Sequence, residues 1–176
     1  MFPQLPVLLG VGAGLVIPAG FFAFEYRIEH KAPYVTLTPF KRSRDPDTGQ
    51  VIPGREEVDF DPRHGHYMKI GEVLIALSSA SLVFIPSLHF SSALPWLGFP
   101  LILLGFTVVY ALGFMGALTY FYEMFLFDPR SFTAFRSSFI FTLGFGAFAC
   151  FALAYVFLAV IVGGAIGSGA LINLSH

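Results

Sequence analysis

The residues in this chain whose types and spacing could do chemistry are charged groups at the edges of long apolar runs. The segment RHGHYMKIGE begins with Arg63 and ends with Glu72, and Lys69 lies three residues before Glu72. Glu72 is close to the start of a long apolar run. An ionisable side chain inside a membrane span is costly and usually faces the bundle interior, so Glu72 is a candidate functional group. The alternative is an intrahelical pair between Lys69 and Glu72.

A short motif recurs beside these groups. The tetrapeptide FDPR occupies residues 60–63 and residues 127–130, and each copy precedes a long apolar run. Asp is a strong N-cap and Pro is favoured at the first helical position, so both copies predict a helix start. Another cation follows each copy, namely Lys69 and Arg136. A duplicated helical hairpin would explain the recurrence, and so would independent selection of similar residues at the membrane interface.

The elements that position these groups are membrane spans. The chain has 176 residues, of which 56% are hydrophobic and 12% charged, and its mean hydropathy is +0.74. A soluble domain is about a quarter charged, and a transmembrane helix needs about 20 apolar residues. We therefore predict one all-α membrane domain over residues 1–176, a bundle of four transmembrane helices at about residues 5–24, 70–90, 97–121 and 137–163.

The charge distribution predicts an orientation. All ten Lys and Arg residues fall around the first and third connections, residues 27–69 and 122–136. Cytoplasmic loops carry an excess of Lys and Arg, so we expect both connections in the cytoplasm and both termini on the other side of the membrane. The first connection is rich in Pro, Gly and Asp, which predicts an irregular loop.

The first span carries two packing signals. Gly10 and Gly14 have the GxxxG spacing that permits close approach of helices in lipid. Pro18 should bend the same helix, and a neighbouring helix must then satisfy the carbonyl that the proline frees.

Several function classes find little support. His64 and His66 are alternate residues at a helix start, which do not face each other, so solvated histidines are favoured over metal ligands. No two histidines lie deep in facing spans, and Cys150 is the single cysteine, so we predict neither haem nor another metal centre. Nucleic-acid binding is disfavoured because ten cations are matched by eleven acids. A transporter is disfavoured because the spans lack a polar constellation at the midplane.

Two segments resemble a known family. Residues 119–144, TYFYEMFLFDPRSFTAFRSSFIFTLG, resemble the junction of the third and fourth helices in the membrane-associated proteins in eicosanoid and glutathione metabolism (MAPEG), which include microsomal glutathione transferases. RHGHYMKIGE is similar to the family signature at the start of helix two, with Lys69 in place of its Asn. The resemblance implies a homotrimeric four-span bundle with glutathione as co-substrate, acting as a transferase or peroxidase on lipophilic electrophiles.

The resemblance also implies roles for individual residues. Arg130 falls near the position of the thiol-activating arginine and is the candidate catalytic residue. A cation beside a thiol lowers its pKa and so raises the thiolate fraction. The remaining candidates would bind glutathione: Arg63, Lys69, Glu72, Tyr120 and Arg136.

A second function class stays open beside the enzyme. The predicted outer side carries no Lys, Arg, Asp or Glu, and the signature is altered, which favours a non-catalytic accessory subunit of a larger respiratory or photosynthetic membrane complex. The 22 Phe residues are expected to contact lipid and pack helices rather than to cage a cofactor.

Overall fold

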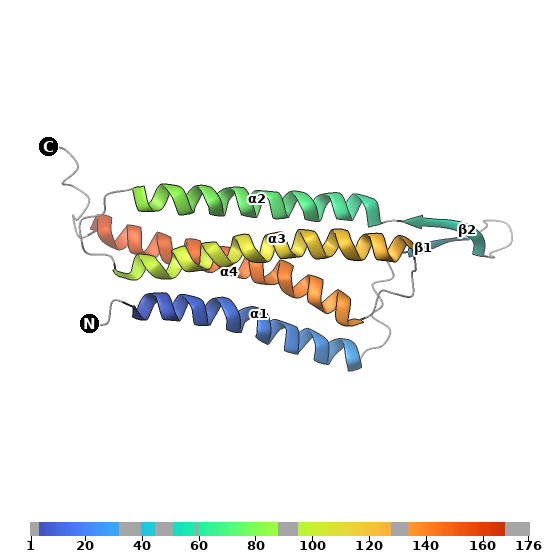
Figure 1. Ribbon diagram of the computed structural model, residues 1–176, viewed down its shortest axis with the longest axis horizontal. Coiled ribbons are helices and arrows are strands. Elements are labelled where there is room, and N and C mark those ends of the chain that lie inside the picture. The colour runs from blue at the N-terminus through green and yellow to red at the C-terminus, as the bar shows by residue number, and fades with distance from the viewer. Residues whose placement is uncertain are drawn as a thin grey trace.

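Four long helices run side by side in the computed structural model, which describes residues 4–31, 40–44, 51–58, 60–87, 95–127 and 134–167 (Figure 1). Within these residues the helices are α1 (Leu5–Lys31), α2 (Phe60–Ser87), α3 (Gly98–Phe127) and α4 (Ala134–Gly167). Each contains a stretch long and apolar enough to cross a membrane: Leu5–Arg27, His64–Pro86, Gly98–Phe121 and Phe135–Gly164. The predicted four-helix architecture of a multi-pass membrane protein is confirmed.

The connection between α1 and α2 contains a β-hairpin. Strands β1 (Phe40–Arg44) and β2 (Val51–Val58) pair antiparallel, with Lys41 opposite Glu57, and the hairpin projects beyond the helices (Figure 1). The prediction of an irregular loop is wrong for these two segments. The stretch DPDTGQ between them is rich in turn formers, which is compatible with a hairpin, although FKRSR before it lacks the apolar alternation of a typical strand.

The second helix begins at Phe60, so the first FDPR motif lies in its first turn, as predicted. Its membrane-spanning stretch, His64–Pro86, begins earlier than the predicted residue 70. Glu72 lies about three turns into the helix. The fourth helix begins at Ala134, and Asp128 and Pro129 of the second motif lie outside the described residues.

The last two helices form the centre of the bundle. α3 and α4 pack antiparallel along their length, α1 packs on both, and α2 packs mainly on α3, so α1 and α2 lie on opposite sides of the central pair (Figure 1). The core between α3 and α4 includes the fully buried Leu103, Leu104 and Cys150. We call the end with the β-hairpin the hairpin end, and the end where α1 starts and α4 finishes the terminal end.

Small residues allow α1 to approach α3 closely. A Cβ atom on Gly14 would overlap the ring of Phe106, and one on Gly10 would lie 3.1 Å from Cβ of Ile102. The close approach predicted from the GxxxG spacing is therefore confirmed, and it is made against α3 rather than against α2.

A residue of α3 also forms a hydrogen bond with the backbone carbonyl that Pro18 frees in α1. Pro18 lacks an N–H and cannot pair with the carbonyl of Gly14, four residues earlier. The hydroxyl of Tyr110 donates a 2.8 Å hydrogen bond to that carbonyl oxygen. The predicted satisfaction of the freed carbonyl by a neighbouring helix is confirmed.

Candidate functional site

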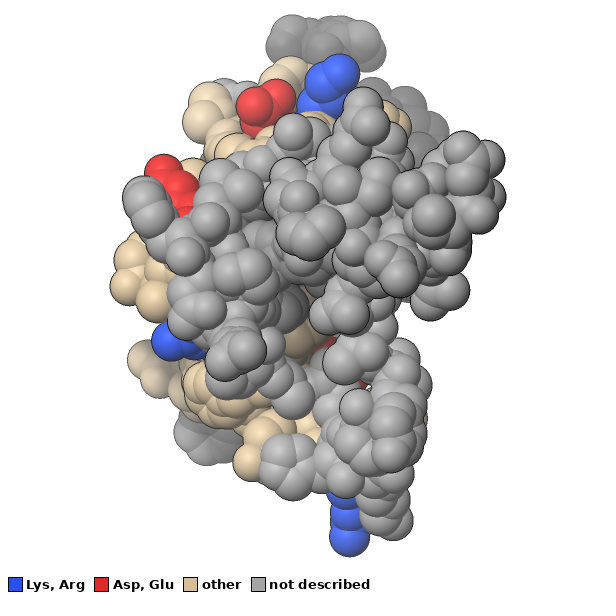
Figure 2. Space-filling view, turned by 90° about the vertical axis from the view of Figure 1, so that its right-hand side faces the viewer, with Lys and Arg blue, Asp and Glu red and all other residues tan. Residues whose placement is uncertain are grey.

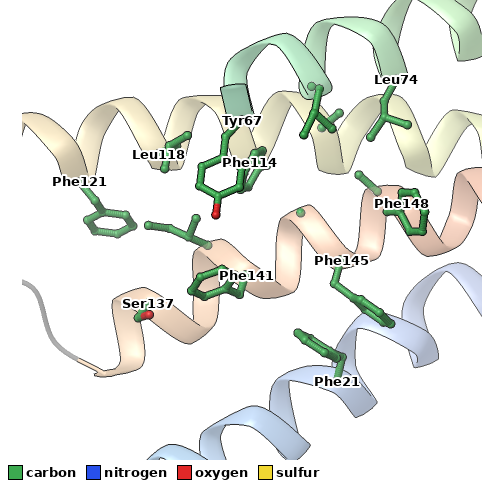
Figure 3. Close-up of a pocket in the computed structure, with 16 residues that line it drawn as sticks. Phe21, Tyr67, Leu74, Phe114, Leu118, Phe121, Ser137, Phe141, Phe145 and Phe148 are labelled. Atoms are coloured by element: carbon green, nitrogen blue, oxygen red, sulfur yellow. The ribbon is translucent and has the colours of Figure 1, made fainter. Parts of the chain in front are cut away.

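An apolar pocket of about 340 Å³ lies in the half of the bundle nearer the hairpin end (Figure 3). Its walls come from α2, α3 and α4, and Phe21 of α1 closes one side. Ligand pockets in proteins commonly measure about 300–1,000 Å³. The space is therefore large enough to hold a small lipophilic molecule.

Helical periodicity explains which side chains line this pocket. On α2 the lining residues include Tyr67, Gly71 and Leu74, and on α3 they include Leu118 and Phe121. Residues three or four apart lie on one face of a helix, so each helix presents a single stripe to the pocket. Glycine removes bulk from the α2 stripe, because a Cβ atom on Gly71 would lie 2.8 Å from the Cγ and Sδ atoms of Met115.

Aromatic rings make up much of the wall and are fixed against each other. Phe21 and Phe145 stack with ring centroids 4.0 Å apart and an interplanar angle of 14°, which joins α1 to α4 (Figure 3). Tyr67 meets Phe114 edge to face, at 6.1 Å and 84°. Seven lining residues are aromatic: Phe21, Tyr67, Phe114, Phe121, Phe141, Phe145 and Phe148.

Two hydroxyl groups supply the polarity of the lining side chains. Tyr67 reaches from α2 with its hydroxyl directed into the pocket, and Ser137 lies near the start of α4 (Figure 3). Ser137 is only 6% exposed. Neither hydroxyl is hydrogen-bonded to another residue of the described chain. The lining contains no Lys, Arg, His, Asp or Glu, so the pocket suits an uncharged occupant.

The predicted site residues on α2 do not face this pocket. Lys69 and Glu72 are exposed, and neither is a lining residue. At 3.6 residues per turn they lie about 200° and 140° around the helix from Tyr67. In the single chain Glu72 does not face the bundle interior, because its helical position places it on the outward side of α2. Arg63 lies in the first turn of α2, and the structure does not describe its side chain.

The structure links two predicted site residues, Tyr120 and Arg136, through a wall of the pocket. Arg136 Cζ lies 5.5 Å from the ring centroid of Phe121, and the Tyr120 ring contacts the same phenylalanine at 5.4 Å. Phe121 lines the pocket, whereas Tyr120 is 59% exposed and is not a lining residue. Arg130, the candidate catalytic residue, lies outside the described residues.

Among the described residues, the charged side chains at this end do not form one patch. In the view onto the hairpin end, the Lys, Arg, Asp and Glu side chains of the described residues appear at separated points (Figure 2). Among the residues that the structure describes, no three His, Cys, Asp or Glu side chains come together as a metal site.

The sequence reasoning did not single out Tyr67, Ser137 or the pocket phenylalanines. Their signal is the repeat of aromatic and small residues at spacings of three and four, as in Phe141, Gly144, Phe145 and Phe148 of α4. The spans are apolar on every face, so residues that line a pocket and residues that face lipid have the same apolar character. The repeat therefore cannot distinguish the two in the sequence.

Comparisons with protein-family models, with curated proteins and with solved structures find no match to this chain. Its function is therefore argued from the pocket and from the residues around it.

Proposed function

We propose that this chain is an integral membrane protein that binds an uncharged lipophilic molecule in the pocket at the hairpin end. The observation that carries the proposal is a cavity of about 340 Å³ whose lining is apolar apart from the hydroxyls of Tyr67 and Ser137. Apolar cavities exclude water and take apolar guests.

Access from the bilayer supports this proposal. Ile70 is 53% exposed and Phe148 is 60% exposed, and both line the pocket. They lie within stretches able to cross a membrane, so the outer side of this wall would face acyl chains. A lipophilic molecule dissolved in the bilayer can then enter laterally without crossing a polar surface.

The orientation proposed from the charges places the pocket toward the cytoplasm. The hairpin end carries the connections that hold the Lys and Arg residues, and this bias marks the cytoplasmic side of a membrane protein. Both termini would then lie on the opposite side.

A glutathione-dependent transferase or peroxidase is the second candidate. The contact of Arg136 with Phe121 favours it, because it puts a cation against a pocket wall, where it could stabilise a thiolate beside a lipophilic electrophile. In a homotrimer, Lys69, Glu72 and Tyr120, which are exposed in the single chain, would be available to a neighbouring protomer. Arg130 keeps its proposed role as the thiol-activating residue.

A photolabelling experiment tests the binding proposal. The purified protein in lipid nanodiscs is irradiated with a diazirine-bearing long-chain alcohol, and the labelled peptides are mapped by mass spectrometry. We expect labelling of pocket residues that excess unlabelled lipophile suppresses. Labelling that is spread over the outer face of α1 and is not suppressed would overturn the proposal.

Matched variants make this experiment specific. Ala147 lines the pocket and is 1% exposed, whereas Ala159 is exposed on the same helix. Ala147→Leu should reduce suppressible labelling several-fold, and Ala159→Leu should leave it unchanged. Ile70→Trp adds bulk to the exposed wall of the pocket and should also reduce suppressible labelling. It replaces Ala147→Leu if that variant lowers the yield of folded protein.

Calorimetric titration with glutathione separates the two candidates. Binding that is lost in both Arg130→Ala and Glu72→Ala would support the transferase. The other outcome is suppressible photolabelling together with no glutathione binding at millimolar concentration. That result would overturn the transferase proposal and favour a non-catalytic role, such as an accessory subunit of a larger membrane complex.

A further inference from the structure

We infer that the pocket selects a planar ring bearing a hydrogen-bond-accepting oxygen, of the quinone or polycyclic ketone kind, and that Tyr67 donates to that oxygen. This inference rests on the proposed binding function and names the chemical class of the occupant. A bilayer offers straight acyl chains in large excess, so the selection must come from the pocket itself.

The aromatic wall favours a flat ring over an acyl chain. Aromatic side chains pack preferentially with other rings in offset-stacked or edge-to-face arrangements. Both arrangements already occur in the wall, in the stack of Phe21 on Phe145 and in the edge contact of Tyr67 with Phe114. These contacts come from all four helices, so a ring in the pocket meets aromatic partners on several sides, which an acyl chain cannot exploit.

The two hydroxyl groups in the lining favour an occupant whose ring carries a hydrogen-bond-accepting oxygen. The Tyr67 hydroxyl is directed into the pocket, and neither it nor the Ser137 hydroxyl has a hydrogen-bond partner among the described residues (Figure 3). A hydroxyl that faces an apolar space gains free energy when an occupant supplies a hydrogen-bond partner, and Ser137 is 6% exposed as a residue. A ketone or quinone oxygen would accept a hydrogen bond from Tyr67.

The same two residues fix the direction of the occupant. Tyr67 is the lining residue of α2 nearest the hairpin end, and Ser137 holds the same place on α4. The oxygen of the ring therefore lies toward the hairpin end, and any tail runs toward the terminal end.

The absence of charge in the lining separates this class from fatty acids. A carboxylate inside the pocket would lose its hydration, and no Lys, Arg or His lines the wall to pair with it. Arg136 lies against Phe121 but does not line the pocket. A neutral oxygen needs one donor, which Tyr67 supplies.

A matched pair of probes tests the inference. Fluorenone and fluorene share one tricyclic skeleton and differ in a ketone oxygen, and decanol represents an acyl chain with a hydroxyl group. Calorimetric titration of the purified protein in one detergent should show fluorenone binding at least tenfold more tightly than decanol. Tyr67→Phe should weaken fluorenone about three- to tenfold, as expected for one hydrogen bond, and leave fluorene unchanged.

Tyr155→Phe provides the control. Tyr155 is 36% exposed, close to the 37% of Tyr67, and its hydroxyl contacts Ser81 Oγ at 2.5 Å on a part of the bundle that does not line the pocket. Its loss should leave fluorenone binding unchanged. A fall equal to that in Tyr67→Phe would overturn the role of Tyr67.

The other outcomes are distinct from failure of the binding proposal. Equal binding of decanol and fluorenone would overturn ring selection while leaving the pocket a lipophile site. Equal weakening of fluorene and fluorenone in Tyr67→Phe would show that the tyrosine packs rather than donates. Loss of suppressible photolabelling altogether would remove the binding proposal, and this inference with it.

Discussion

Tyr110 of α3 donates a 2.8 Å hydrogen bond to the carbonyl oxygen of Gly14 in α1, the carbonyl that Pro18 leaves without a helical partner. Gly146 of α4 approaches the same place, since a Cβ atom there would lie 3.1 Å from Cβ of Pro18. Three helices therefore meet at the irregular point of the first one. In a bilayer, where water cannot replace the lost bond, this contact allows a proline in mid-span.

A double-mutant cycle on Tyr110 and Pro18 should measure this contact. Tyr110→Phe removes the donor and should lower the free energy of unfolding by about 0.6–1.7 kcal/mol, the range for interhelical hydrogen bonds in membranes. Pro18→Ala restores an N–H for the Gly14 carbonyl, so Tyr110→Phe should cost less in that background. Unfolding in mixed micelles measures both values. Strictly additive costs would contradict the assignment.

Substitution of Gly14 should separate α1 from α3. A Cβ atom on Gly14 would overlap the ring of Phe106, whereas one on Gly12 would meet nothing within 4 Å. Gly14→Ala should therefore destabilise the protein by about 1–3 kcal/mol, as overpacking does. Gly12→Ala is the matched control and should be neutral or slightly stabilising, because alanine favours the helix. Thermal unfolding in detergent measures the difference, and equal effects of the two variants would argue against the close approach.

Removal of the Phe21 ring should open the α1 side of the pocket. Phe21 stacks on Phe145 and closes that side, while Phe24 on the same helix is 63% exposed. Phe21→Ala should speed release of a bound lipophile several-fold, since an aromatic pair contributes about 0.5–1.5 kcal/mol beyond its buried area. Phe24→Ala should not change the rate. Stopped-flow displacement of a fluorescent lipophile measures release, and unchanged release in Phe21→Ala would show that the ring does not limit exit.

Cysteine labelling in intact cells should establish the orientation. The natural Cys150 is fully buried, so the unsubstituted chain is the background control. A membrane-impermeant maleimide should label Gln4→Cys at the terminal end directly, and Ser43→Cys in the hairpin only after the cells are opened. The reverse pattern would place the hairpin end outside, against the distribution of Lys and Arg.

The overall architecture could be predicted from the sequence because length and apolar content decide whether a segment can cross a membrane. The start of α2 could not be located this way, since RHGHYMKIGE is too polar to count as a span although its residues are compatible with a helix. The two strands of the hairpin could not be recognised because they are rich in charged residues and lack a regular apolar alternation. Pro18 was interpreted correctly because a missing N–H has the same consequence in any membrane helix.

Much less of the candidate site could be predicted. Ionisable residues are conspicuous in an apolar chain, which makes Lys69 and Glu72 candidates, yet both lie on the outward side of α2. The pocket residues have the same composition as the lipid-facing ones, and only the positions of neighbouring helices distinguish them. Phe148 lines the pocket and is 60% exposed, whereas Phe24 and Phe84, each 63% exposed, do not line it.

The placement of α1 and α2 on opposite sides of the central pair has a consequence for biosynthesis. The first two spans share no extensive contact, and their main packing surfaces are on α3 and α4, which are made later. Transmembrane helices can insert individually and associate afterwards. The first two spans therefore gain their main packing partners only when the second half of the chain has been made, and the pocket can form only once α4, which supplies Ala147 and Phe148, is in the membrane.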